Sequence, residues 1–262
     1  MTDAVPTPFN ALILAGSRGG VDPLAAYAGV AHKALILLEG RTLLARVADA
    51  LRQAGAGVIA VSVSDAAVRD HAVALGLRVL DAASGPSLSV GDGIAALGTP
   101  LLVTTADHAL LRPEWITRFQ SDIPADADVA VLLARRDVVE AAAPGTRRTY
   151  LRFADGGWSG CNLFRFATPR SIAAIDLWRQ VEADRKRPWR IVRRLGPGLL
   201  LRYALGRLTL GDAIAHLGRK AGLVAAAVAT PYGLAAVDVD KPADLDLVRS
   251  LPPVPPVPPV PR

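Results

Sequence analysis

The chain has 262 residues, and its 51% hydrophobic and 21% charged residues are typical of a globular protein rather than a disordered one. The net charge of +6 favours anionic partners such as nucleotides, phosphorylated substrates or an acidic membrane surface. Four Tyr and five Phe leave few rings for base stacking, so nucleic acid is not expected as a partner. The single cysteine excludes an internal disulfide. We find no secretion leader and no apolar run of about 18 residues, so we expect a soluble, cytoplasmic protein.

The first half of the chain alternates short apolar runs with amphipathic stretches. We expect strands at residues 11–14, 57–63, 78–80, 100–105 and 129–134, and helices at 43–54, 65–75, 87–97 and 113–119. Nearly continuous apolar strands that alternate with helices indicate an α/β fold, with a mostly parallel central sheet and helices on both faces. Ligands bind such sheets at the carboxyl ends of the strands, so we expect the site there.

The pattern changes after residue 146, where alternation at 147–153, a turn at Asp155-Gly156-Gly157 and a returning run at 160–166 predict a hairpin. Further on we expect helices at 169–184, 185–219 (basic, and broken near Gly196) and 242–251, strands at 223–230 and 234–237, and a disordered polyproline II tail at 252–262. The predicted organisation is one domain at 1–251, with an acceptor-binding helical insertion at about 146–220, followed by the tail.

The stretch at residues 11–33 carries the first candidate site. Its buried strand ends in Ala15-Gly16-Ser17-Arg18-Gly19-Gly20, and successive N–H groups in such a glycine-rich loop form a hollow that binds anions. Arg18 adds a planar, permanent charge and Lys33 a compact one. The loop matches neither a P-loop nor a dinucleotide fingerprint. We therefore expect a polyphosphate site, for a nucleoside triphosphate, with Ala15, Gly16, Ser17 and Gly19 as nucleotide-binding residues and Arg18 and Lys33 as catalytic residues.

Carboxylates follow two later segments. Asp107 comes directly after the strand at 100–105, where its hard oxygens suit a divalent cation, although it would also suit the cap of a turn. Asp238 and Asp240 alternate, so they should point to one face and repel each other unless a cation or Lys241 relieves them. The alternative for Asp240 is to cap the helix that begins at Pro242.

Three other groups are candidates for binding substrates. The loop at residues 84–90 enters a helix, so its glycine and serines would contact a base and ribose, or only cap the helix. The Asn162 amide offers a donor and an acceptor to a hydroxylated substrate, or belongs to a turn. Arg147, Arg148 and Arg152 are either phosphate clamps or surface residues.

The motif LAGSRG…HKAL, followed by Gly40-Arg41-Thr42-Leu43-Leu44 and a helix, resembles the start of the MobA-like nucleotidyltransferases. The segment at 237–245 resembles their N-x-N-T-P-E-D-L element, although Asp replaces Asn here. The resemblance implies a GT-A/Rossmann-like fold and Mg²⁺ held by Asp107 and Asp240. It also implies base recognition near Gly85 and Ser89, which leaves CTP and GTP open, and acceptor binding by Asn162. In the family the first loop is usually longer, and here an insert at 21–31 precedes Lys33.

The resemblance implies Mg²⁺-dependent transfer of a nucleotidyl group from CTP or GTP to a phosphorylated small-molecule or lipid-linked acceptor, with release of pyrophosphate. The acceptor phosphate is already an anion and needs no general base, so the site has to align two anions and balance their charge. The alternatives are a GT-A-type glycosyltransferase, or a non-catalytic nucleotide-binding or membrane-surface module. The basic stretch at 185–219 would lie on an anionic bilayer, form a dimer surface or cover the acceptor pocket. Oligomeric state is not predicted.

Overall fold

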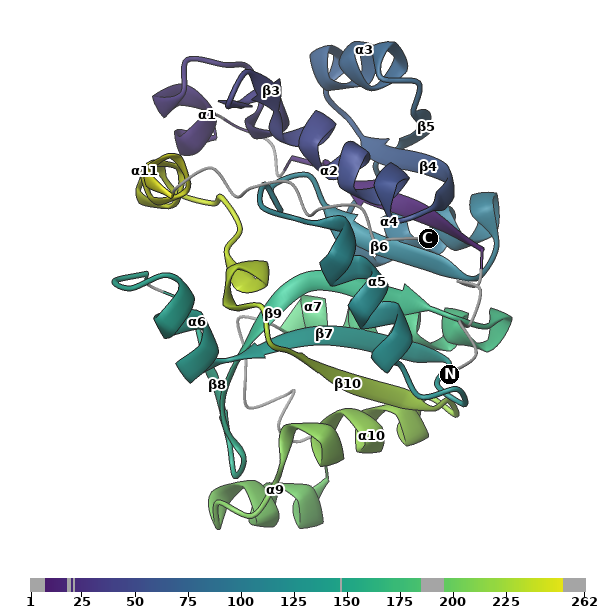
Figure 1. Cartoon of the computed structure of the whole chain (residues 1–262). Coiled ribbons are helices and arrows are strands. Elements are labelled where there is room, and N and C mark those ends of the chain that lie inside the picture. The colour runs from purple at the N-terminus through teal and green to yellow at the C-terminus, as the bar shows by residue number, and fades with distance from the viewer. Residues whose placement is uncertain (1–7, 18–19, 21, 147, 185–195, 252–262) are drawn as a thin grey trace, which may run out of the picture.

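A computed structural model describes residues 8–17, 20, 22–146, 148–184 and 196–251 (Figure 1). The predictions for Arg18, Gly19, Arg147 and the Pro-rich tail fall outside these residues. The centre is an eight-stranded sheet with the order β10-β7-β9-β6-β1-β4-β5, in which β8 pairs with β9. Its strands are β1 (Phe9–Leu14), β4 (Ala56–Val63), β5 (Arg78–Asp81), β6 (Leu101–Thr105), β7 (Val129–Arg135), β8 (Leu151–Phe153), β9 (Gly156–Phe166) and β10 (Ala225–Thr230). A small second sheet pairs β2 (Leu37–Leu38) with β3 (Arg41–Thr42).

Helices join these strands in the alternating order that the sequence predicts. They are α1 (Pro23–Tyr27), α2 (Leu43–Gln53), α3 (Ala66–Ala74), α4 (Pro86–Leu97), α5 (Pro113–Asp122), α6 (Arg136–Ala142), α7 (Ala173–Asp184), α9 (Pro197–Ala204), α10 (Leu210–Lys220) and α11 (Pro242–Ser250). The described residues also form the short 3₁₀ helices η1 (Lys33–Leu35), η2 (Pro169–Ile172) and η3 (Gly233–Ala236). Among the described residues, no helix is both long enough and apolar enough to cross a bilayer.

Helices cover both faces of the sheet, as β1 shows. Ala11 and Ile13 belong to a core shared with α2 and α5, whereas Leu12 faces the other way into a core shared with α4 and α7. Parallel pairing joins β1 to β4 and β6, β4 to β5, and β7 to β10. A strand buried on both faces needs apolar residues at successive positions, which explains the continuous apolar runs. The predicted α/β class with a mostly parallel sheet is confirmed.

The predicted hairpin forms, and its second strand lies inside the sheet. Leu151 pairs with Trp158 and Phe153 with Gly156, so β8 is shorter than the alternation predicts. β9 then runs antiparallel between β6 and β7. Part of the segment expected as an insertion at 146–220 is therefore central to the sheet, and it carries Asn162 into the region of the strand ends.

The predicted strand at residues 234–237 is wrong. The chain instead forms the 3₁₀ helix η3, in which Val237 N donates to Leu234 O over 3.0 Å. Gly233 lies against α6 so closely that a Cβ would come within 2.2 Å of the carbonyl oxygen of Val138. A short, uniformly apolar run does not distinguish a strand from a buried turn, and this close packing selects the turn.

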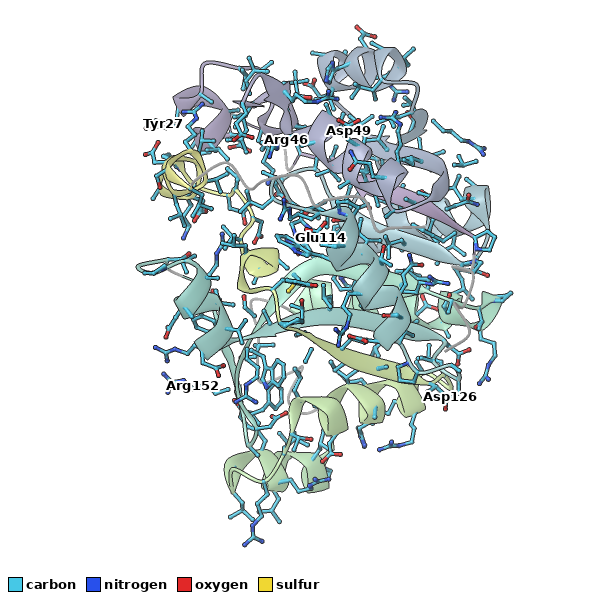
Figure 2. The ribbon with its side chains drawn as sticks, in the orientation of Figure 1. Tyr27, Arg46, Asp49, Glu114, Asp126 and Arg152 are labelled. Atoms are coloured by element: carbon cyan, nitrogen blue, oxygen red, sulfur yellow. The ribbon has the colours of Figure 1, made fainter. Side chains whose placement is uncertain are left out.

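Two short helices, α1 and α6, were not expected. In the insert at 21–31, Asp22 Oδ1 accepts hydrogen bonds from the backbone N–H groups of Leu24 (2.8 Å) and Ala25 (3.3 Å), and Pro23 occupies the first turn of α1. The hydroxyl of Tyr27 donates to Asp246 of α11 over 3.1 Å, which places the insert beside the C-terminal helix (Figure 2). The pair Asp22-Pro23 is a local signal for the start of a helix, and the sequence contained it.

The close approach at Gly233 gives a prediction about stability. Gly233→Ala should lower the free energy of unfolding by about 2 kcal/mol or more, because the new methyl group overlaps the backbone of α6. Gly211→Ala is the matched control, since a Cβ there meets open space on the helix α10 and should leave stability equal or higher. Urea unfolding of both variants measures the difference, and equal stability would contradict this packing.

Candidate active site

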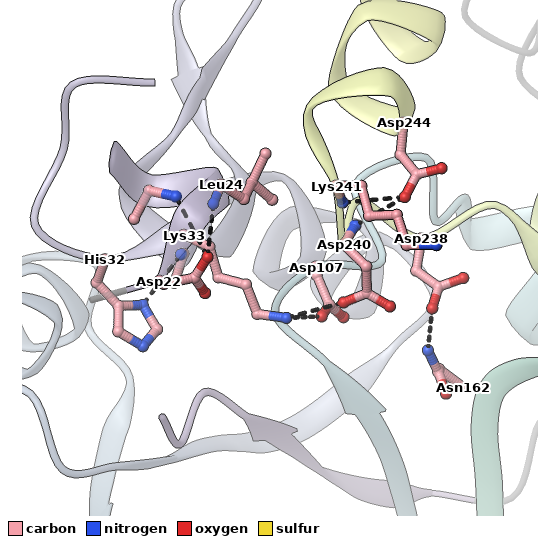
Figure 3. A network of polar contacts seen from close by, with 12 residues as sticks. Asp22, Leu24, His32, Lys33, Asp107, Asn162, Asp238, Asp240, Lys241 and Asp244 are labelled. Atoms are coloured by element: carbon pink, nitrogen blue, oxygen red, sulfur yellow. Dashed lines mark hydrogen bonds and ion pairs between the residues drawn. The ribbon is translucent and has the colours of Figure 1, made fainter. Parts of the chain in front are cut away.

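Lys33 lies at the centre of a charge cluster at the carboxyl edge of the sheet. Its ammonium donates a hydrogen bond to Asp107 Oδ2, and it donates to Asp240 Oδ1 over 3.1 Å (Figure 3). Burial disfavours the charged ammonium, but the two carboxylates outweigh that effect and raise the pKa of Lys33 well above its usual value. Lys33 is therefore a permanent cation shared by two acids that lie far apart in the sequence.

The backbone around Asp107 fixes this acid against the other strand ends. Ala106 N donates to Leu14 O over 3.0 Å, which joins the end of β6 to the end of β1, where the glycine loop begins. Val239 N donates to Asp107 O over 3.0 Å, which brings the C-terminal acids to the same place. Asp107 is buried, and its Oδ1 has no hydrogen-bond partner among the described residues. Burying a carboxylate oxygen without a hydrogen bond costs free energy, and a bound cation would remove that penalty.

Asp240 does not cap the closing helix, so its side chain stays available. The carboxylate of Asp244 accepts hydrogen bonds from the backbone N–H groups of Lys241 (3.0 Å) and Asp240 (3.2 Å), and thus supplies the cap from inside α11. The Asp240 carboxylate is half-exposed and turns to Lys33 instead. Burial alone would raise the pKa of Asp240, but the charge and hydrogen bond of Lys33 lower it below its usual value.

Among the described side chains, Asp238 and Asp240 contact different cations, and the hydrogen bonds and ion pairs of neither acid involve the Lys241 ammonium that the sequence analysis considered. Arg148 binds Asp238 through Nη1–Oδ1 (2.8 Å) and through Nη2 to the backbone oxygen (2.6 Å), while Asn162 Nδ2 donates to Oδ2 over 2.9 Å. Arg148 Nη2 also lies 3.7 Å from Asp244. Burial nevertheless raises the pKa of Asp238 to about 6. Arg148 is thus paired inside the protein rather than exposed on the surface, and its role as a phosphate clamp stays a prediction.

Asn162 reaches Asp238 because its backbone leaves the regular strand conformation. Its φ of 46° is in the left-handed region, at the point where the register between β7 and β9 shifts. Asn tolerates this conformation better than most residues, and a bulge redirects the side chain. The preceding residue, Cys161, is buried. Binding of the acceptor by Asn162 stays a prediction, with its amide oxygen still available.

The loops expected to hold the nucleotide lie beside each other. A Cβ at Gly16 would come 3.6 Å from Cβ of Ala82, so the loop after β1 contacts the loop after β5. Ser17 is exposed at the end of β1. Ser89 is buried and its Oγ accepts a hydrogen bond from Ala83 N over 3.0 Å, which fixes the second loop, and Gly85 is the N-cap of α4. The roles of these residues, and of Ala15, in nucleotide binding stay predictions.

Sequence reasoning missed two supporting residues, His32 and Arg148. His32 is buried, and its Nδ1 accepts from Ala34 N over 3.1 Å, so it caps the 3₁₀ helix that begins at Lys33. Burial lowers the pKa of His32, which favours the neutral ring that can accept this bond. His is an uncommon helix cap, so the only sequence signal for this role was the position of His32 directly before Lys33. For Arg148 the only signal was its place in the arginine-rich segment at 147–153.

Comparison with known proteins identifies the family. The family model described as "MobA-like NTP transferase domain" matches residues 11–197, which is most of the chain. The chain belongs to the MobA-like NTP transferase family. This confirms the resemblance seen in the sequence and the nucleotidyltransferase class of the enzyme. No curated protein matches the chain.

Solved structures with a similar fold are known. A hypothetical transferase from Thermus thermophilus has 31% identity and a TM-score of 0.76, over 91% of this chain and 99% of that one. A nucleotidyl transferase from Methanothermobacter has 18% identity and a TM-score of 0.55, over 92% and 96% of the two chains. The CTP:phosphocholine cytidylyltransferase of Streptococcus pneumoniae has 12% identity and a TM-score of 0.55, over 93% and 98%. The last two share the fold.

The buried pair of Arg148 and Asp238 gives a second prediction. Arg148→Met should lower the free energy of unfolding by about 3 kcal/mol, because it leaves the Asp238 carboxylate buried without its cation. Arg148→Met/Asp238→Asn should recover much of this loss, since no unpaired charge remains. Arg179→Met, which breaks an exposed pair with Asp176, is the control and should change stability by less than about 0.5 kcal/mol. A double variant as unstable as the single one would contradict the pairing.

Proposed function

We propose that the protein transfers a nucleotidyl group from CTP or GTP to a phosphorylated acceptor in the presence of Mg²⁺ and releases pyrophosphate. The observation that carries the proposal is the meeting of Lys33, Asp107 and Asp240 at the edge of the sheet where the glycine loop begins. One cation and two carboxylates from three distant segments form a site suited to a metal-bound triphosphate. Membership of the MobA-like family supports the same class of reaction.

The donor groups fit a magnesium ion. Asp107 and Asp240 supply hard carboxylate oxygens, one of them buried without a partner, and the Lys33 ammonium already acts as a cation between them. Within the described residues, no third His, Cys, Asp or Glu completes a metal-binding group. Two carboxylates are a usual protein contribution to a Mg²⁺ site, in which water and substrate phosphates provide the other ligands. When bound, the ion would polarise the phosphate and neutralise its charge.

The chain's own residues would bind and align two anions. Backbone N–H groups at Ala15, Gly16 and Ser17 would cradle phosphate oxygens. Lys33 would exchange its carboxylate partners for the nucleotide's phosphates and the pyrophosphate that leaves, because a compact ammonium suits both. The acceptor phosphate attacks the α-phosphorus as an anion, so no residue has to remove a proton. Asn162 would use its amide oxygen to orient a hydroxyl of the acceptor.

Incubation with each of the four NTPs, Mg²⁺ and a pool of phosphorylated metabolites tests the function. The expected result is pyrophosphate release with CTP or GTP and a product whose mass is that of the acceptor plus a nucleoside monophosphate minus one water. Hydrolysis of nucleotide sugars instead of pyrophosphate release would indicate a glycosyltransferase. Nucleotide binding without turnover on any acceptor would contradict the proposal.

Lys33→Ala should lower turnover on the order of 10²-fold or more, because it removes the charge that balances the phosphates in the transition state. Because the variant leaves the buried Asp107 carboxylate without its cation, it should also be less stable, so turnover is measured at a temperature at which circular dichroism shows the variant folded. Steady-state kinetics of pyrophosphate release measures the effect. Full activity of Lys33→Ala would show that Lys33 has another role.

Lys33 should also compete with a divalent cation for the same two carboxylates. Without nucleotide, Lys33→Met should bind Mn²⁺ at least about 5-fold more tightly than the wild type, because one nearby positive charge is gone. Lys33→Arg keeps that charge and should bind Mn²⁺ like the wild type. The signal of free Mn²⁺ in electron paramagnetic resonance measures both, and equal affinity of all three proteins would exclude a shared site.

A further inference from the structure

Arg46 joins two of the segments that form the charge cluster of the active site. It lies near the start of α2 and is labelled in Figure 2. Its Nε donates a hydrogen bond to Ala109 O over 3.1 Å, and its Nη1 donates to Leu38 O over 3.4 Å. Ala109 comes two residues after Asp107, and Leu38 comes five residues after Lys33. One planar guanidinium thus connects the backbone that follows each of these two charged residues.

The turn between β2 and β3 holds the guanidinium of Arg46 in this position. Glu39 Oε2 accepts a hydrogen bond from Arg46 Nη1 over 2.8 Å. Glu39 (φ 52°) and Gly40 (φ 76°) are both in the left-handed region, as in a type I′ hairpin turn. Glutamate is not among the residues that favour this conformation, so its ion pair with Arg46 helps to hold the turn. The segment from η1 to β3 is therefore tied to α2 by directed contacts.

A buried core below the charge cluster contains the same segments. Leu38 and Ala109 belong to it together with Val239, which lies between the two C-terminal acids. All three side chains are buried, and Val239 N donates to Asp107 O over 3.0 Å. Apolar packing is non-directional, so it brings the segments together without fixing their exact separation. The hydrogen bonds of Arg46 add that direction for two of the segments.

Loss of Arg46 should change the geometry of the site more than the stability of the fold. Its side chain is 25% exposed, and it lines a groove of about 410 Å³ between α2, α5 and α11. Water in this groove can replace the hydrogen bonds of the guanidinium at a small cost in free energy. Separate waters do not hold two backbone segments at one distance, and a misplacement of about 1 Å in an active site costs up to about 10²-fold in rate.

We propose that Arg46 is a positioning residue, which holds the backbone after Lys33 against the backbone after Asp107 and so sets where the ammonium meets the two carboxylates. The partners of Arg46 are two backbone oxygens and Glu39, so it acts on the cluster through the backbone. Its effect on turnover rests on the proposed function, whereas its effect on the geometry of the cluster does not.

Arg52 offers a matched control on the same helix. It pairs with an acid, Asp49, over 3.2 Å, and it donates to a backbone oxygen, that of Leu75. Leu75 is the C-cap of α3, which carries no member of the charge cluster. Arg52→Met therefore removes the same charge and the same kinds of contact from α2 as Arg46→Met, but it leaves the two segments of the active site untouched.

Crystal structures of the two variants without ligand test the geometry. In Arg46→Met, the distance between the Cα atoms of Lys33 and Asp107 should increase by about 1 Å, and the ammonium should lose contact with at least one of its two acids. In Arg52→Met the cluster should stay as it is in the wild type. An unchanged cluster in Arg46→Met would overturn the proposal, whether or not the protein has the proposed activity.

Steady-state kinetics tests the consequence for turnover. Arg46→Met should lower kcat on the order of 10-fold or more and change the KM of the nucleotide less than about 3-fold, because misplaced charge is lost chiefly in the transition state. Arg52→Met should keep the wild-type kcat, and both variants should unfold within about 3 °C of each other, since each lacks one partly exposed ion pair. Wild-type kcat in Arg46→Met would overturn the proposal.

Two further results keep the tests separate. Arg46→Lys keeps a charge beside Glu39 but not the fork that spans two carbonyl groups, so it should fold and still lower kcat about 3-fold or more. If Arg46→Met does not fold, Arg46→Lys decides, and a wild-type kcat in it would overturn the proposal. A displaced cluster in Arg46→Met, together with no pyrophosphate release by the wild type, would contradict the proposed function and support the positioning role.

Discussion

Two carboxylates cannot lie close together in a partly buried site without a cation, and Lys33 meets this requirement for Asp107 and Asp240. The contact depends on the ends of β1 and β6, on the 3₁₀ helix capped by His32, and on the segment before α11. Each is held by backbone hydrogen bonds that do not involve the charged groups. The scaffold therefore positions the charges, and the charges are left available for a ligand.

Arg148, Asp238 and Asp244 form a second charged group beside the cluster of Lys33, Asp107 and Asp240, and each group has its own cation. Arg148 and Asn162 satisfy Asp238, and Asp244 caps α11, which leaves the Asp240 carboxylate to contact Lys33. The strand β9 is essential to this division, because its bulge at Asn162 places an amide beside Asp238 from the middle of the sheet. A segment that reads in the sequence as an added hairpin is thus a part of the site's framework.

Much of this arrangement follows from local signals in the sequence. The apolar strands that precede Gly16 and Asp107 are continuous runs with one interpretation, and a parallel sheet brings their ends to one edge. The resemblance to the MobA-like family, rather than strand order, placed Lys33 and Asp240 at the same edge. The pairing of Asp238 with Arg148 was not predictable, because the two residues are 90 positions apart and arginines in segments with an exposed pattern usually face water. The strand expected at 234–237 failed because the close packing of Gly233 on α6 is a tertiary contact without a local signature.

The most direct test of the central claim is an anomalous-scattering map of crystals grown with Mn²⁺ and a non-hydrolysable analogue of CTP or GTP. The account predicts one strong manganese peak within coordination distance of both Asp107 and Asp240, with the Lys33 ammonium moved from the carboxylates to the phosphates. A map in which nucleotide is bound, Lys33 still bridges the two acids and manganese lies elsewhere would contradict it.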